Sequence, residues 1–92
     1  GILEKDLQSA IDQADDMCKN LTISDDAKII IIEMIFQLGG TGVSKFRKMW
    51  QALQQDPPDY AEASVQMLDS RWAKQTPNRA KEMARHMSEC VV

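Results

Sequence analysis

The stretch Asp26–Leu38, DAKIIIIEMIFQL, is followed directly by Gly39-Gly40 and decides how this chain folds. Its apolar side chains point in almost every direction around a helix, which is typical of a helix buried on most sides. Ser24 or Asp25 can cap its start, and the glycine pair predicts its end, because glycine easily takes the backbone conformation that terminates a helix. We therefore expect a central, buried helix. We interpret Glu33 as lying on its one exposed edge rather than as a buried general acid, because no second carboxylate is placed to complete a catalytic pair.

The segment before this helix also has helical periodicity. A seam of apolar residues, spaced alternately by four and three, predicts a helix over residues 2–20: Leu3, Leu7, Ala10, Ala14, Met17 and Leu21. The seam is short for a free coiled coil, so we expect it to pack on its own domain rather than to form a dimer.

Three more helices are predicted after the glycine pair. The first, SKFRKMWQALQQ, begins at Thr41 or Ser44 and ends at Asp56-Pro57-Pro58. The second, YAEASVQMLDS, is capped by Asp59, and we expect its inward side chains to be Tyr60, Ala63, Met67 and Leu68. The third runs from Pro77 to about Glu89, with Ala80, Met83, Ala84 and Met87 inward. The sequence therefore predicts one all-α domain over residues 1–92, a compact bundle of about five helices.

Composition narrows the classes of function. A hydrophobic content of 43% with 27% charged residues is typical of a globular protein. Residues 1–33 hold eight acids against three lysines, whereas residues 34–92 hold eight bases against six acids. This asymmetry lacks the dense basic stripe of a nucleic-acid-binding protein. The apolar run Ile29–Phe36 is too short to span a membrane, and Glu4, Lys5 and Asp6 interrupt any signal peptide. We expect no nucleic-acid or membrane partner.

Motifs for catalysis, metals or cofactors are weak. Cys18, Cys90 and the single His86 match no metal-ligand spacing, so we expect reduced thiols, no metal and no cofactor. The stretch GGTGVSK lacks the preceding strand and the glycine before the lysine of a phosphate loop, so it is predicted to be a helix–helix turn.

Arg79 is placed where the helix itself does not favour it. Thr76-Pro77 is typical of a helix start, with a hydroxyl cap followed by proline at the first position. Arg79 then falls in the first turn, where the helix dipole disfavours a cation by a few tenths of a kcal/mol. Its position predicts an anionic partner. If the anion lies within this chain, Asp69 or Glu82 is the expected one.

Two stretches together resemble a known family. EMIFQLGGTGVSKFRKMWQAL (residues 33–53) and MLDSRWAKQTPNRAKEMA (residues 67–84) resemble the C-terminal lobe of phage-type lysozymes, the peptidoglycan-cleaving muramidases of tailed phages. ILEKDLQSAIDQADDM, residues 2–17, stands where that family has the helix entering this lobe. The resemblance implies a helical lobe whose catalytic partner, an N-terminal lobe with the glutamate, aspartate and threonine of the active site, is absent here.

The resemblance also implies roles for individual residues, none of them catalytic. Arg79 matches an arginine that reaches across the cleft to the catalytic glutamate. Gln37 matches a position lining the substrate groove, with the indole of Trp72 packed behind it. Phe36 and Arg71 flank these positions and support the cleft wall.

Two functions remain open at this stage. In the first, the chain is the non-catalytic lobe of a phage lysozyme; its partners are peptidoglycan glycan or an N-terminal lobe, and it does not hydrolyse alone. In the second, it is a lysozyme lobe reused as a phage-encoded inhibitor of a host protein complex. Retention of the cleft residues favours the first. The small, acidic and helical character of the chain suits the second, because such a protein exposes a compact charged face to a basic partner. Either way we expect a phage-encoded protein in the host cytoplasm.

Overall fold

The computed structural model describes residues 2–90, with side chains from residue 8 onward. Six helices and no strand occur within that part of the chain: α1 (Ile2–Cys18), α2 (Asp25–Ser44), α3 (Arg47–Leu53), α4 (Tyr60–Leu68), α5 (Arg71–Gln75) and α6 (Pro77–Ser88). The radius of gyration is 12.3 Å. A compact domain of this length is expected to have about 12 Å, so the all-α globular fold predicted from the sequence is confirmed.

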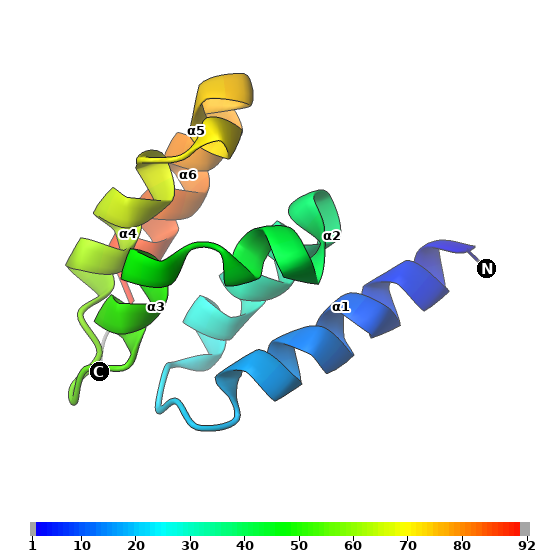
Figure 1. Ribbon diagram of the computed structural model, residues 1–92, viewed down its shortest axis with the longest axis horizontal. Helices are drawn as coiled ribbons and strands as arrows, with labels where there is room; N and C mark the ends of the chain where they lie inside the picture. The colour runs from blue at the N-terminus through cyan, green and yellow to red at the C-terminus, as the bar shows by residue number, and fades with distance from the viewer. Residues whose placement is uncertain (1, 91–92) are drawn as a thin grey trace.

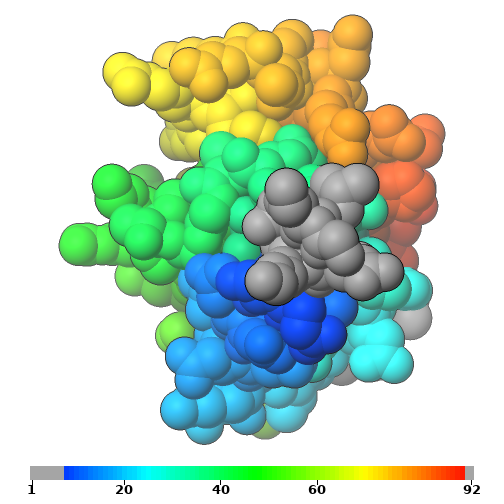
Figure 2. Space-filling model, turned by 90° about the vertical axis from the view of Figure 1, so that its right-hand side faces the viewer, coloured from blue at the N-terminus to red at the C-terminus, as the bar shows by residue number. Residues whose placement is uncertain are grey.

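Helix α2 lies between two groups of helices (Figure 1). It packs against α1 on one side and against α6 on the other, while α4 packs against both α3 and α6. The space-filling view (Figure 2) shows α1, in blue, against the cyan and green residues of α2, with α5 and α6, in yellow to red, beyond. The central position predicted for this helix is therefore confirmed.

Side-chain caps set several helix starts. The hydroxyl of Ser24 accepts a hydrogen bond from the Ala27 amide at 3.2 Å, and the Asp59 carboxylate accepts one from the Glu62 amide at 3.0 Å. Each bond satisfies an amide that the first turn of a helix leaves unpaired. The caps expected at these two residues from the sequence are thus present.

Gly39 ends the regular part of α2. Its backbone has φ 80° and ψ 159°, a conformation essentially restricted to glycine, and the residues after it form a short helical turn that ends at Ser44. The predicted stop at the glycine pair is therefore a kink. The helix expected from Thr41 or Ser44 begins only at Arg47, because Thr41–Ser44 continue the kinked end of α2.

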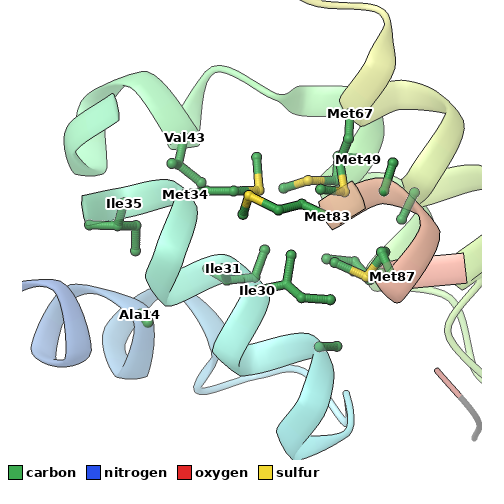
Figure 3. Close-up of a cluster of buried hydrophobic side chains, with 14 of the residues drawn as sticks. Ala14, Ile30, Ile31, Met34, Ile35, Val43, Met49, Met67, Met83 and Met87 are labelled. Atoms are coloured by element: carbon green, nitrogen blue, oxygen red, sulfur yellow. The ribbon is translucent and has the colours of Figure 1, made fainter. Parts of the chain in front are cut away.

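The core is rich in methionine. Ile31, Met34, Met49, Met67 and Met87 are among the largest side chains that are fully buried. Figure 3 shows the thioethers of α2, α3, α4 and α6 meeting between the helices, with Met83 beside them. These flexible side chains fill the irregular space where helices of different length converge.

Several details of the predicted pattern are wrong. The bundle has a sixth helix, α5, whose five residues are too few to produce a periodic signal. Leu68 is exposed rather than inward, and α2 is not buried all round, since Ile29 and Phe36 are 52% and 49% exposed. In α1, Ala10 and Ala14 are buried as expected, whereas the side chains of Leu3 and Leu7 lie outside the described residues.

By length and composition alone, α2 is also long and apolar enough to cross a membrane, because the helix extends well beyond the run Ile29–Phe36. A core helix passes the same test, and α2 packs against α1 and α6.

Candidate functional site

A groove runs between α2 and α6, which lie antiparallel (Figure 1). It encloses about 760 Å³. Ile30 and Met83 are the buried residues of its wall, and Ile29 contributes exposed apolar surface. Its charged and polar rim is formed by Asp26, Glu33, Asn78, Arg79, Glu82, His86 and Glu89. Acids outnumber bases around it, so Arg79 lies in a predominantly acidic groove.

Arg79 is the third residue of α6 and is exposed. It forms no ion pair with any side chain among residues 8–90, although Glu33 and Glu82 line the same groove. Asp69, the other anion considered from the sequence, lines a different concavity, near the start of α3. The anion expected for Arg79 is therefore not supplied by the described part of the chain.

Thr76 does not cap α6 in the way the sequence predicted. Its hydroxyl donates to the carbonyl oxygen of Trp72 at 2.9 Å, which ties it to the end of α5. No side-chain cap therefore offsets the unpaired amides beside Arg79, although proline occupies the first turn as expected.

Gln37 and Trp72 are brought together by the fold. The indole Nε1 of Trp72 donates to Gln37 Oε1 at 3.2 Å, and Gln37 Nε2 donates weakly to the Met83 sulfur at 3.5 Å. Trp72 is only 5% exposed, and its ring meets Phe46 edge-on, with centroids 6.3 Å apart. The exposed Gln37 side chain is thus held against a buried indole, which fixes its orientation.

Phe36 and Arg71, the other two residues predicted for the site, are both exposed and line neither concavity described here. Of the five predicted site residues, only Arg79 lines the groove. Gln37 and Trp72 contact each other but line neither concavity, and Phe36 and Arg71 also lie outside the groove. Glu33 is exposed on α2, as expected, and its position on the groove wall opposite α6 was missed. Glu33 faces α6 across the groove because α2 packs antiparallel to α6, and the periodicity of the sequence does not predict that packing.

A second concavity of about 430 Å³ lies where α2 turns into α3. Three cations, Lys45, Arg47 and Lys48, line it together with Phe46 and Asp69. We call these five residues the basic corner. From the sequence, this segment is predicted only as the start of a helix. The signal that could have identified it is the absence of any acid between Glu33 and Asp56.

The titratable groups that could bind metals or act as nucleophiles are sparse. No cluster of three His, Cys, Asp or Glu side chains suited to a metal ion occurs in the described part of the chain. Both cysteines are free thiols, and burial raises the pKa of Cys18 and of Cys90 above the usual 9.0. A thiol with a raised pKa is mostly protonated at neutral pH, so neither has the character of an activated nucleophile.

Known proteins similar to this chain include lysozymes. Probable T4-type lysozyme 2 of Dictyostelium discoideum is 31% identical over 83 residues, which cover 86% of this chain and 48% of that protein. The peptidoglycan hydrolase gp36 of Pseudomonas phage phiKMV is 31% identical over 85 residues, which cover 91% of this chain and 9% of that protein. Probable T4-type lysozyme 1 of D. discoideum is 38% identical over 53 residues, which cover 58% of this chain and 30% of that protein.

Over most of its length this chain is therefore similar to part of a phage-type lysozyme. No family model and no solved structure matches it. The lysozyme-like region spans about half the length of the first of these relatives and less of the others.

Proposed function

We propose that this lysozyme-like region acts as the non-catalytic C-terminal lobe of a phage-type lysozyme and forms one wall of a peptidoglycan cleft. The names of its relatives, T4-type lysozymes and a peptidoglycan hydrolase, support peptidoglycan as the polymer. Their greater length supports a partner lobe that carries the catalytic groups.

The position of Arg79 carries the proposal. A cation in the first turn of a helix costs about 0.3–1 kcal/mol against the helix dipole. No ion pair with the side chains of residues 8–90 offsets that cost, and the guanidinium is exposed on an open groove. Such an arginine is suited to a carboxylate supplied from outside, either by the catalytic lobe or by the peptidoglycan itself.

The exposed apolar residues of α2 support a docking role over the alternative. Ile29 and Phe36 are seven residues apart, so they lie on the same side of the helix, and both are about half exposed. Surface of this kind is expected where another part of a lysozyme packs. An inhibitor that used its acidic α1 as the contact would not need it.

Hydrolysis by this chain alone is not expected. A glycosidase places two carboxyl groups, or a carboxylate and a held water, on opposite sides of the scissile bond. Glu33 and Glu82 do line one groove, but both side chains are exposed and on helices of the same lobe. We assign the groove to binding through Arg79 rather than to bond cleavage.

The test is co-sedimentation of the purified chain with purified bacterial peptidoglycan sacculi, comparing the wild type with Arg79→Ala and Lys81→Ala. Lys81 is an exposed cation on the same helix that lines neither concavity, so it controls for net charge. We expect Arg79→Ala to reduce retention about tenfold, the loss of one charge-assisted hydrogen bond, while Lys81→Ala retains binding. Circular dichroism should show both variants folded.

Retention that is equal in all three proteins, or absent in all three, would refute the role of Arg79. Specific binding of a host protein complex through α1, abolished by substituting its exposed aspartates, would instead establish the inhibitor function. A large loss of stability in Arg79→Ala would show that its anion lies within this chain.

A further inference from the structure

We propose that the basic corner is a second binding site and that it takes a saccharide carrying one anionic group. The corner shares no lining residue with the α2–α6 groove. The choice of a saccharide rests on the proposed function, whereas the requirement for an anion rests on the corner alone.

The charges of the corner are not explained by the fold. Lys45, Arg47 and Lys48 are all exposed, and none forms an ion pair with a side chain among residues 8–90. Three cations within four residues repel one another, and this repulsion is relieved when an anion binds between them. Since the chain as a whole carries a net charge of −3, the local accumulation of positive charge is specific to this surface.

The remaining groups of the corner limit the kind of anion. Asp69 lines the same concavity, and no hydrogen bond to its carboxylate is present among the described side chains. Its negative charge disfavours a bare anion at close range. The carboxylate is, however, a good acceptor for hydroxyl groups. A ligand with both an anionic group and hydroxyls satisfies the cations and Asp69 at the same time.

The apolar part of the corner suits a sugar ring. Phe46 is half buried and lines the concavity, and its edge-on packing with Trp72 holds the phenyl ring in place. Buried Met49 closes the floor. A fixed aromatic ring beside polar groups is the usual composition of a small-ligand site, and about 430 Å³ lies within the range of such sites.

Ser70 also lines the concavity but is not available to the ligand. Its hydroxyl donates to the Met67 carbonyl at 2.7 Å and accepts from the Ala73 amide at 3.2 Å, which caps α5. Gln66 lines the concavity as well, and its Nε2 already donates to Glu62 Oε1 at 2.8 Å. Recognition therefore falls mainly to the three cations for the anionic group, Asp69 for hydroxyls and Phe46 for the ring.

The experiment is a titration of the ¹⁵N-labelled chain monitored by amide chemical shifts, with three sugars that share one ring. N-acetylglucosamine is neutral, N-acetylmuramic acid adds a carboxylate, and N-acetylglucosamine 6-phosphate adds a phosphate. We expect one or both acidic sugars to shift the amides of residues 45–49 and 66–70, and the neutral sugar to bind at least about tenfold more weakly. Which acidic sugar binds more tightly identifies the anionic group. Inorganic phosphate should bind more weakly than the sugar phosphate.

A matched pair of variants separates the site from general charge. Arg47→Gln/Lys48→Gln and Lys81→Gln/Arg85→Gln remove the same number of positive charges, and only the first pair lines the corner. We expect the first pair to lose at least about tenfold in affinity and the second to bind as the wild type does. Equal binding of neutral and acidic sugars, equal binding of phosphate with and without the sugar, or equal loss in both pairs would overturn the proposal.

The two proposals fail in different ways. If the acidic sugars shift only amides that line the α2–α6 groove, the corner is not a site and the cleft function stands. If sacculi are not retained but the corner binds an acidic sugar, the cleft function fails and the corner remains.

Discussion

Replacing Gly39 with alanine tests what sets the kink in α2. A methyl group at this position would meet no heavy atom within 4 Å, so a purely steric argument predicts no effect. The backbone at φ 80° and ψ 159° predicts a large one, because residues with a Cβ adopt that region at a cost of about 1–3 kcal/mol. Alanine also restricts the unfolded chain, which returns about 0.4–1 kcal/mol. We expect Gly39→Ala to lower the free energy of unfolding by about 1–2 kcal/mol.

Gly40→Ala is the matched control, because at this position sterics predict a clash and at Gly39 they predict none. A methyl group there would collide with the side-chain amide of Gln13 on α1. That amide is the end of a flexible side chain held by hydrogen bonds to Ser9, at 3.2 Å to its carbonyl and 3.1 Å to its hydroxyl. These exposed bonds contribute little, and Gly40 has helical geometry, so alanine gains up to about 1 kcal/mol of helix propensity. We expect Gly40→Ala to be neutral or slightly stabilising.

The assay is urea unfolding followed by circular dichroism at 25 °C, supported by thermal melts. Each kcal/mol should shift the melting temperature by about 4–8 °C in a domain of this size. A Gly39→Ala variant as stable as the wild type, or a Gly40→Ala variant that is the less stable of the two, would refute the backbone explanation of the kink.

Two further predictions follow from hydrogen bonding and burial. Gln37→Ala should lower the free energy of unfolding in urea by about 1 kcal/mol, because it removes the acceptor of the buried Trp72 indole. Gln37→Glu keeps an acceptor and should lose less. Equal losses in the two variants would show that the hydrogen bond contributes nothing. Burial raises the pKa of Cys18 and Cys90 above 9.0, so the folded chain keeps these protons after the unfolded chain has lost them, and stability should be constant up to about pH 9 and fall above it. In Cys18→Ala/Cys90→Ala the free energy of unfolding should no longer fall between pH 9 and 10.5. A fall above pH 10.5 should remain, because the hydrogen bond of Lys28 to Asp15 raises the pKa of Lys28. An unchanged fall from pH 9 would contradict the assignment to the cysteines.

The elements that sequence analysis predicted well depend on local signals. The seam at Ala10 and Ala14, the caps at Ser24 and Asp59, and proline at the start of α6 each act within one or two helical turns. Each of these features is determined by residues within a short segment, so the sequence of that segment is sufficient to predict it.

The features that were missed depend on tertiary contacts or on competition between partners. Thr76 has a cap's residue type, but the Trp72 carbonyl provides its hydroxyl with another acceptor. Leu68 continues an inward stripe in sequence, yet it is the last residue of α4 and is 42% exposed, so its neighbours cover it only in part. The groove around Arg79 is formed by the packing of α2 on α6, so the sequence could place the arginine on its helix but not in the same groove as Glu33.

Oxidation of the buried methionines would report how often the helices of this chain separate. Met34, Met49, Met67 and Met87 are fully buried, so an oxidant such as hydrogen peroxide reaches their sulfurs only when the helices separate. Conversion of a buried thioether to its sulfoxide places a polar, chiral group in the core and disfavours re-closure. Each oxidation event therefore makes the next more probable. Apart from Met17, which is only partly buried and can be oxidised without opening, mass spectrometry should show chains that carry several sulfoxides rather than a gradual distribution of single ones.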